Sequence, residues 1–337
     1  MTEVAGVEEL GAINRGEDME ITTYLEQGMM SELSANVVDL CPVGALTHRP
    51  WAFNARPWEM RKTESIDVMD ALGSAIRVDV RGREVMRILP RNNDAVNEEW
   101  ISDKARHIAD GLRTQRLDQP YIRRDGKLKA ATWTEALGLV AEKLKAAKPD
   151  RIGVIAGDLA GAEEMFAIKD LMTRLGVANL DCRQDGAKLD PSLGRASYLF
   201  NSTIEGIEQA DAILLVGTNP RLEAAVLNAR IRKRYRQGGL QVALVGEKAE
   251  LDLRHGRDLW FVKASGSAIR PTVPVRLLAV VDAAVAAAKG THRSLEHVYR
   301  LIRPERRGKV SVVIITGHGA VSVPQQVLFE LNHEVAN

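Results

Sequence analysis

Cysteine and aromatic residues are both scarce in this sequence. The 337 residues contain two cysteines, Cys41 and Cys182, and only 4% aromatic residues. Two cysteines so far apart provide no disulfide framework and fit a reducing compartment. The aromatic residues are scattered and do not alternate with basic ones, which argues against a surface that stacks on nucleic-acid bases. Composition therefore argues against a disulfide-stabilised or base-stacking protein.

An excess of charge and a long apolar run are missing as well. Lys and Arg number 46 against 45 Asp and Glu, so the net charge of +1 creates no field that favours nucleic acid or acidic lipid. The longest apolar run, residues 277–288, contains Asp282 and is shorter than the ~20 residues that span a bilayer. Met1–Val4 have neither the basic start nor the apolar centre of a signal peptide. We expect any membrane association to go through partner subunits.

A regular alternation of strand and helix patterns follows residue 150. Strands are predicted from short apolar runs at 151–156 (buried), 211–216, 240–245, 259–262 and 309–316. Helical patterns lie between them at 162–175, 222–236 and 275–288. Continuous apolar strands between helices predict a mostly parallel sheet with helices on both faces. The expected fold class is α/β.

Four local patterns add detail outside this alternation. Residues 74–88 alternate polar and apolar residues around Arg81-Gly82, which predicts a hairpin whose second strand ends at Pro90. Thr132 and Glu135 have the spacing of a capping box and predict a helix through Ala147. The polar run 92–99 is expected to be exposed. The basic run 230–236 suits a helix C-terminus, which we expect to be solvated or to face a partner.

Cys41 is followed directly by proline. In bacterial ferredoxins a Cys-Pro element supplies one thiolate ligand of a [4Fe–4S] cluster, and a C-x2-C-x2-C run supplies others. Pro42 would turn the chain away just after the ligand. Residues 39–46 read as a loop that enters a short helix, whose free N–H groups can bond to cluster sulfurs. The other thiolates are absent from the sequence, and a Cys-Pro taken alone is more often a buried cysteine before a turn.

The surroundings of Cys41 carry a family resemblance. The segments concerned are Thr2–Gly6, Cys41–Thr47, Ala55–Glu59, Lys62–Asp70, Ile88–Arg91 and Asn97–Lys104. They resemble the large, G-type iron–sulfur subunit of NADH-quinone oxidoreductase (respiratory complex I). The resemblance implies that Cys41 is a ligand of one [4Fe–4S] cluster. Its partner cysteines would lie upstream of Thr2, so the chain would be a fragment truncated at both ends. The full-length protein would hold the cluster and the 337 residues alone would not.

The same resemblance implies three domains. Residues 1–57 would be the C-terminal part of a ferredoxin-like [4Fe–4S] domain. Residues 58–117 would be a small β module of the molybdopterin-oxidoreductase type, and 118–337 an incomplete, doubly wound α/β domain of the same type. In the β module, the positions that hold cysteines in the family are occupied by residues with oxygen donors: Asp67, Asp70, Ser74 and Ser102. Oxygen donors do not suit an iron–sulfur cluster. These residues are expected to cap turns and helix starts.

Two features of the α/β domain bear on cofactors. Gly217–Pro220 resembles the Gly-x-Asn-Pro segment that lines the dinucleotide in molybdopterin enzymes. Complex I subunits keep this fold without the metal, so we expect an inherited turn with Pro220 at the start of a helix, and no molybdenum. Cys182 is expected to be a buried, inert thiol. From His255 onward the pattern departs from the family, and no site is inferred there.

The function that the resemblance implies is one-electron relay. Electrons from NADH, delivered through flavin, would pass along iron–sulfur clusters toward quinone, without a catalytic residue in this chain. The partners would be the flavin- and NADH-binding subunit and the quinone-side subunits of the peripheral arm. The location would be the cytoplasmic face of the bacterial inner membrane or the matrix face of the mitochondrial one. Two alternatives stay open: a molybdopterin or nicotinamide oxidoreductase with a pocket near Gly217, and a metal-free structural or assembly subunit.

Overall fold

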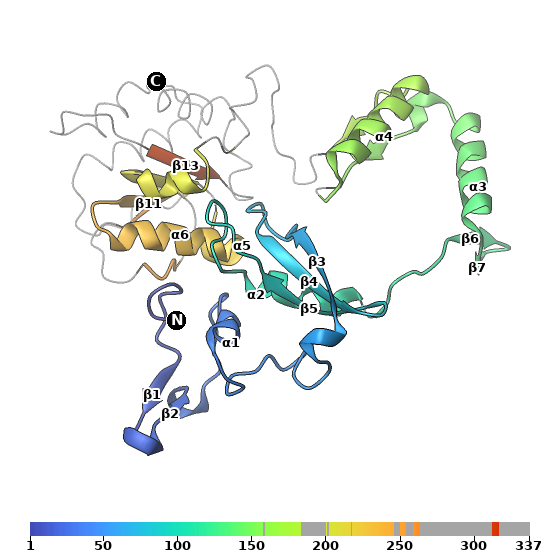
Figure 1. Cartoon of the computed structure of the whole chain (residues 1–337). Coiled ribbons are helices and arrows are strands. Elements are labelled where there is room, and N and C mark those ends of the chain that lie inside the picture. Colours follow the sequence, from blue (N-terminus) through green and yellow to red (C-terminus); the bar gives the residue numbers. More distant parts are fainter. Residues whose placement is uncertain are drawn as a thin grey trace, which may run out of the picture. The chain divides into compact units, whose positions relative to one another are not determined.

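The chain forms two compact units, which Figure 1 colours along the sequence. The first combines residues 1–109 with 188–337, and the second consists of residues 110–187. The computed structural model describes residues 1–182 except 113 and 158, residue 200, and residues 202–216, 218–245, 250–253, 259–262 and 312–316. The helix predicted at 275–288 lies outside the described residues.

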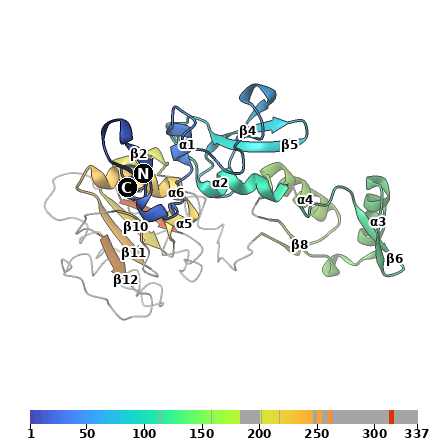
Figure 2. The same cartoon turned by 90° about the horizontal axis from the view of Figure 1, so that it is seen from below.

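A parallel sheet forms the centre of the first unit (Figures 1 and 2). Its strands are β10 (Ala212–Val216), β11 (Gln241–Val245), β12 (Leu259–Val262) and β13 (Val312–Thr316), in the order β12-β11-β10-β13. All three strand pairs are parallel. The parallel sheet predicted from the continuous apolar runs is therefore confirmed.

Helix α6 (Ala225–Arg236) packs on this sheet. Ile231 belongs to one buried cluster with Ile213 and Leu215 of β10 and with Val242 of β11. The predicted single helix over 222–236 is instead two, because α5 (Pro220–Glu223) ends at Ala224, whose φ of −148° and ψ of 76° are not helical. Pro220 begins α5, as expected for a residue without a backbone donor.

The basic run of α6 is buried at its start, whereas Lys233 and Arg236 in the last turn are exposed, in line with the predicted solvated or partner-facing helix end. Arg230 and Arg232 are buried. The Arg230 guanidinium donates to the Glu208 carboxylate. Arg232 donates to the backbone oxygens of Thr2 at 2.9 Å and Glu3 at 3.1 Å. Carbonyl groups of irregular segments need donors when water is excluded, and these guanidinium groups supply them.

The first unit also contains an antiparallel sheet. It comprises β3 (Arg61–Ile66), β4 (Ala75–Arg81) and β5 (Glu84–Pro90), with β4 in the middle. Arg81 pairs with Glu84 across the Gly82 turn, so the predicted hairpin and its end at Pro90 are confirmed. Ile101 is fully buried against this sheet just before α2 (Asp103–His107).

The polar run 92–99, predicted to be exposed, contains one buried residue and three partly exposed ones. Asn97 is fully buried, because its amide replaces missing backbone partners. Its oxygen accepts from the N–H of Ala75 at 2.8 Å, and its nitrogen donates to the carbonyl of Trp100 at 3.1 Å.

The N-terminal residues contain less regular structure: the short pair β1 (Gly11–Ile13) and β2 (Glu20–Thr22), and α1 (Asn36–Leu40).

The second unit holds two strand pairs and two helices. The antiparallel pair is β6 (Tyr121–Arg124) with β7 (Lys127–Ala130), and the parallel pair is β8 (Val154–Ile155) with β9 (Leu180–Asp181). Helix α3 (Trp133–Ala146) begins at the predicted capping box, and α4 (Ala162–Arg174) ends before Gly176 as predicted. The strand predicted over 151–156 has only two residues, and its Ile155 is exposed, because a two-stranded sheet offers it no second layer. No helix in the described parts of the chain is long and apolar enough to cross a bilayer.

Candidate functional site

Cys41 lies at the C-terminal end of α1, not ahead of a helix as the sequence suggested. Its backbone N–H donates to the Val37 carbonyl at 3.0 Å and so completes the last turn of α1. Its φ of −72° and ψ of 113° are extended, as expected for a residue before proline. Residues 42–46 then form turns and bends, not a helix.

The turn after Cys41 folds back onto its sulfur. The thiol donates to the Val43 carbonyl at 3.1 Å. Hydrogen bonds with the backbone of Leu46, Val43 and Ala45 lower the pKa of the Cys41 thiol below its ordinary value, against a smaller opposing effect of desolvation. The side chain is partly accessible to solvent. The backbone groups of Leu46, Val43 and Ala45 therefore favour the thiolate of this accessible sulfur, the state in which cysteine binds metal, whereas the bond to the Val43 carbonyl exists only in the protonated thiol.

Helices α1 and α2 are joined by polar side chains that fix the position of Cys41. The Asn36 amide donates to the carbonyl of Ile101 at 2.8 Å and accepts from its N–H at 3.2 Å. Arg106 of α2 forms an ion pair of 2.5 Å with Asp39, two residues before Cys41. Because Asn36 and Arg106 are buried, these bonds are shielded from competing water.

The start of α2 adds a second set of contacts to α1. Asp103 accepts a hydrogen bond from the Ser34 hydroxyl at 2.6 Å and another from the Ala35 N–H at 3.0 Å. Both carboxylate oxygens of Asp103 are therefore used in holding the segment that enters α1. The result is a Cys41 turn anchored to a neighbouring helix instead of lying free on the surface.

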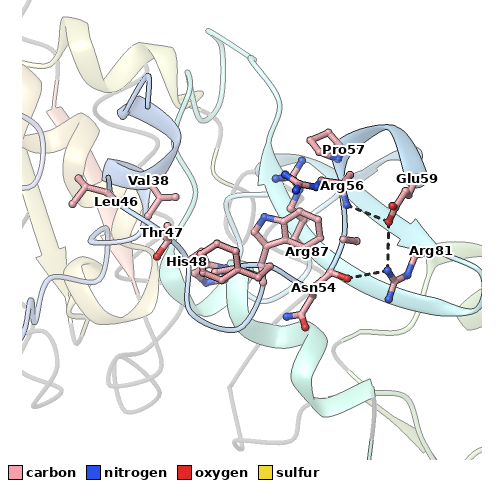
Figure 3. A pocket seen from close by; sticks show the side chains of 14 residues that line it. Val38, Leu46, Thr47, His48, Asn54, Arg56, Pro57, Glu59, Arg81 and Arg87 are labelled. Atoms are coloured by element: carbon pink, nitrogen blue, oxygen red, sulfur yellow. Dashed lines mark hydrogen bonds and ion pairs between the residues drawn. The ribbon is translucent and has the colours of Figure 1, made fainter. Parts of the chain in front are cut away.

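A pocket of about 500 Å³ lies beside the residues that follow Cys41 (Figure 3). Arg81 points toward residues of its rim, donating to the Asn54 carbonyl at 2.9 Å and lying 3.5 Å from Glu59. Arg87 lies 4.5 Å above the ring of Trp51. The pocket is lined by Val38, Leu46, Thr47, His48, Trp51, Ala52, Phe53, Asn54, Ala55, Arg56, Pro57, Glu59, Arg81 and Arg87.

The charges of the pocket are balanced from within the protein. Asp79 is completely buried and forms ion pairs with Arg87 at 2.8 Å and Arg77 at 2.9 Å. Glu59 accepts from the backbone N–H of Arg56 at 3.2 Å as well as lying near Arg81. The arginines therefore stabilise the wall behind the Cys41 segment.

Comparison with known families covers most of the chain in three parts. Residues 1–47 match the family described as NADH-quinone oxidoreductase subunit 3, ferredoxin-like domain. Residues 60–110 match the family described as NADH-ubiquinone oxidoreductase NDSU1/NuoG-like, 4Fe-4S domain. Residues 116–263 match the family described as molybdopterin oxidoreductase.

Curated relatives agree with this order. The G-type subunit of NADH-quinone oxidoreductase from Rickettsia bellii (strain RML369-C) is 56% identical over 245 residues, which are 73% of this chain and 36% of that protein. The mitochondrial 78 kDa subunit of NADH-ubiquinone oxidoreductase from Neurospora crassa is 56% identical over 250 residues, 73% of this chain and 34% of that protein. The mitochondrial 78 kDa protein from Candida albicans is 49% identical over 315 residues, 90% of this chain and 43% of that protein.

Over most of its length this chain is similar to the G-type subunits of NADH-quinone oxidoreductases and to the mitochondrial 78 kDa subunits of NADH-ubiquinone oxidoreductases. It spans about a third to two fifths of the length of these relatives. The family matches confirm the predicted fold class, ferredoxin-like parts followed by a molybdopterin-oxidoreductase-like α/β domain. Among solved structures, acetylene hydratase from Pelobacter acetylenicus has a TM-score of 0.43 and 15% identity, covering 55% of this chain and 27% of its own.

The 4Fe-4S match of this NuoG-like chain falls on residues that do not fit a cluster. Residues 60–110 contain no cysteine. Asp67 and Asp70 each accept a backbone N–H two residues further on, at 3.0 Å and 2.9 Å. Ser102 caps α2 by accepting the Ala105 N–H at 3.1 Å. The prediction that these residues cap turns and helix starts is thus confirmed for Asp67, Asp70 and Ser102, and for Ser74 it stays a prediction.

The two carboxylates of this module are perturbed by burial. Desolvation raises the pKa of Asp67, and the Lys104 ammonium acts in the opposite direction. Desolvation also raises the pKa of Asp70, and the negative charge of Asp67 raises it further. The Asp67 Oδ2 is buried without a hydrogen-bond partner. Carboxylates that are costly to ionise are poor substitutes for four thiolates.

The sheet edge that resembles the dinucleotide-lining segment of molybdopterin enzymes is used internally where the structure describes it. Gly217 lies outside the described residues. The Glu223 carboxylate accepts from the Asn219 N–H at 2.8 Å and from the Thr218 hydroxyl at 2.9 Å. A phosphate bound there would have to displace a carboxylate of the same charge.

Cys182 differs from its prediction, and one pair of histidines meets across the sequence. Cys182 is exposed, not buried, because it follows β9 in a sheet of only two strands. His48 and His107 lie side by side although they are 59 positions apart in the sequence, a contact that no local pattern indicates. Among the described residues, no three His, Cys, Asp or Glu side chains are arranged to hold a metal ion.

Proposed function

We propose that this chain is part of an electron-relay subunit of NADH:quinone oxidoreductase and that Cys41 is one thiolate ligand of a [4Fe–4S] cluster. The observation that carries the proposal is the Cys41 turn, in which backbone groups lower the pKa of an accessible thiol. A buried, inert cysteine before a turn would have neither property. When bound, such a cluster accepts and releases single electrons.

The residues around Cys41 would hold and tune this ligand. Asn36 and Arg106 fix the helix that ends just before Cys41. The turn at Val43–Leu46 would direct N–H groups toward sulfur, and such hydrogen bonds raise the potential of a cluster. The chain contributes positioning and electrostatics to the relay, and we assign it no bond-making step.

The remaining ligands must come from outside the 337 residues. The sequence holds Cys41 and Cys182, and two thiolates cannot hold four irons. We therefore propose that the partner cysteines precede Thr2 in the protein's gene, and that the 337 residues expressed alone bind no cluster. A stoichiometric four-iron spectrum from these residues would contradict this part of the proposal.

Assembly with other complex I subunits is proposed from the names of the relatives. Those relatives are subunits of NADH-quinone and NADH-ubiquinone oxidoreductases. We propose that this chain sits in the peripheral arm between the flavin-binding subunit and the quinone-side subunits. It would face the cytoplasm in a bacterium or the matrix in a mitochondrion. Co-purification with the flavin-binding subunit after mild detergent extraction tests this placement, and recovery of the chain alone would oppose it.

Cluster reconstitution tests the role of Cys41. The chain, extended upstream through its preceding coding sequence, would be loaded anaerobically with iron and sulfide. Cys41→Ala should lose the irons and the absorption of one cluster, while the matched variant Cys182→Ala should keep both. Retention of the cluster in Cys41→Ala would refute the proposal. So would a preceding coding sequence without three cysteines.

The thiol itself can be tested in the chain as it stands. The rate of alkylation by iodoacetamide follows the thiolate fraction, so Cys41 should react at a lower pH than a free cysteine does. Peptide mass spectrometry separates Cys41 from Cys182, whose modification in the same sample normalises the amount of reagent. An alkylation profile of Cys41 that matches free cysteine would remove the observation on which the proposal rests.

A molybdopterin enzyme is the second candidate, favoured by the match of residues 116–263 to molybdopterin oxidoreductases. The bonds of Glu223 to Asn219 and Thr218 count against a dinucleotide phosphate at that sheet edge. Fluorescence analysis for oxidised pterin in acid-treated protein decides between the two. Pterin in stoichiometric amount would favour the second candidate over the relay.

A further inference from the structure

Residues 48–62, the aromatic segment, expose large aromatic side chains. The aromatic residues of the chain are few and mostly scattered, yet three of them lie in this segment: Trp51, Phe53 and Trp58. Phe53 is 100% exposed and Trp58 is 79% exposed. Exposed apolar side chains that concentrate on one part of a surface mark interaction sites, whereas single ones need no explanation. The aromatic segment is therefore a candidate interaction surface.

Phe53 is held in solvent by a turn that has a conformational cost. Its φ of 65° lies in the left-handed region, which is unfavourable for a residue with a Cβ. The next residue fixes this turn: the Asn54 amide donates to the Pro50 carbonyl at 2.8 Å, and the Asn54 carbonyl accepts from Arg81 at 2.9 Å. Backbone strain of this kind is concentrated at binding and switch sites. The conformation does not bury the ring in this chain, but it presents the ring to a partner.

A concave site lies beside Phe53. Phe53 and Trp51 both belong to the lining of the pocket of about 500 Å³ (Figure 3). Arg87 lies 4.5 Å above the Trp51 ring and is paired with the buried Asp79 at 2.8 Å, so this wall is held in place. The anchors of protein interfaces are side chains that fill such pockets on the other molecule. The aromatic segment thus offers a projecting ring and a hollow for an anchor of the partner.

The charge of the aromatic segment indicates the chemistry of that partner. Its exposed basic residues outnumber its acidic residues by four to one: Arg49, Arg56, Arg61 and Lys62 against Glu59. The whole chain has a net charge of only +1, so this is a local concentration of positive charge. Potentials of opposite sign face each other across protein interfaces. An acidic partner surface therefore complements the aromatic segment.

The exposed rings are large enough to support a stable contact. A buried aromatic side chain removes about 150–250 Å² from solvent, so Phe53 and Trp58 together offer roughly 300–500 Å². A stable interface buries about 800 Å² on each side. These two rings would supply a large part of that area, and the pocket and the basic side chains extend it.

We propose that the aromatic segment is a docking surface for another protein, whose acidic surface faces the basic side chains and whose apolar side chain fills the pocket. Phe53 and Trp58 are its anchors. A protein is the matching class of partner because it supplies both carboxylates and a side chain shaped for the pocket. That this protein is another subunit of the oxidoreductase rests on the proposed function. The docking surface itself uses neither Cys41 nor a cluster.

Photo-crosslinking tests this surface in the complete protein. The gene, extended upstream through its preceding coding sequence, is expressed with p-benzoylphenylalanine in place of Phe53 or of Trp58, and the cells are irradiated. Mass spectrometry of the digest should show both positions joined to one subunit, at a segment in which Asp and Glu outnumber Lys and Arg. Phe166 of α4 is the matched control position, because it is 72% exposed, and it should not reach that segment.

Charge variants of Arg56 test the complementarity. Arg56→Glu should lower the crosslink yield at position 53 by at least about tenfold, since like charges across an interface repel, and Arg56→Lys should keep most of it. The Arg56 backbone N–H that donates to Glu59 is retained in both variants, so the turn is preserved. An equal yield in Arg56→Glu and Arg56→Lys would contradict the acidic partner.

The crosslinking result can also refute the surface independently of the proposed assembly. Crosslinks only to lipid, to nucleic acid or to a basic protein segment would refute it. A chain that co-purifies with the flavin-binding subunit but gives no protein crosslink at either position would refute the docking surface and leave the proposed assembly standing. A chain that neither co-purifies nor crosslinks would refute both.

Discussion

Asp39→Ala and Arg106→Leu break the same ion pair, yet they should differ in cost. The Arg106 side chain is 3% exposed, whereas that of Asp39 is 28% exposed. Removing Asp39 leaves a guanidinium charge inside the protein. Removing Arg106 leaves a carboxylate that water can reach. The energetic penalty of an unpaired ion depends on its burial, so the two variants are not equivalent.

The structure sets the approximate magnitudes. Removing one partner of a buried ion pair costs about 3–5 kcal/mol. Arg106 keeps its 3.3 Å contact with the Asn36 oxygen, which places Asp39→Ala near the lower end, about 3 kcal/mol. Arg106→Leu removes an Nε that is already buried without a partner, and it puts an apolar side chain in its place. We expect about 1 kcal/mol for that variant.

Native-state hydrogen exchange measures this difference locally. Peptides that span α1 and α2 report the free energy of opening these helices without requiring the two-unit chain to unfold in one step. The double variant Asp39→Ala/Arg106→Leu should recover most of the stability that Asp39→Ala loses, because it no longer contains an unpaired buried charge. Glu59→Ala removes an exposed pair with Arg81 and should change stability by at most ~1 kcal/mol. Equal costs for the two single variants, or a larger cost for Arg106→Leu, would refute the reasoning.

Four further predictions concern stability elsewhere. Thr132→Ala should cost about 1 kcal/mol in the second unit by removing the cap of α3, as followed by circular dichroism in urea. Hydrogen bonds with Thr132 lower the pKa of Glu135 below its ordinary value of 4.5. The stability that ionised Glu135 contributes is therefore present above pH 4.5 and is lost as the pH falls through its lowered pKa in the folded protein. A stability that does not change with pH in this acid range would contradict the prediction. Burial raises the pKa of Asp67, so ionised Asp67 destabilises the folded state at pH 7. Asp67→Asn should therefore raise the urea midpoint at pH 7, and this gain in stability should vanish below pH 3.8, the ordinary pKa of the carboxyl. Gly6→Ala should destabilise the folded protein by more than about 1–2 kcal/mol. Gly6 has a φ of +87°, and a Cβ added there would lie 2.5 Å from the Asp252 carbonyl oxygen. An unchanged urea midpoint would show that the backbone relaxes.

The parts of the fold that the sequence predicted are those that depend on neighbours in the chain. The strand β10, the hairpin of β4 and β5, and the capping box at Thr132 each follow from patterns within a few residues. A further hairpin was available in the same way. Asp125-Gly126 joins β6 and β7 with positive φ values of 51° and 77°, as an Asp-Gly turn requires.

The site depended on contacts that no local pattern encodes. Cys41 could be singled out because proline follows it, but the order of helix and turn around it was reversed. Asn97, Arg230 and His107 look like surface residues in the sequence. Asn97 is buried because its oxygen accepts from the distant Ala75 N–H, Arg230 is buried because it donates to the distant Val96 carbonyl, and His107 meets a histidine 59 positions away. Such pairings become visible only in three dimensions.

The bridge between α1 and α2 also determines when the cysteine acquires its surroundings during protein synthesis. Asn36 and Ile101 are 65 positions apart, and Asp39 and Arg106 are 67 apart. A ribosome that adds about 5–20 residues per second needs roughly 3–13 seconds to cover that interval. Until residue 106 has been added, the sulfur of Cys41 lacks its supporting helix. If Cys41 is a cluster ligand as proposed, iron delivered so early would meet an unformed turn, and loading would follow the synthesis of residue 106.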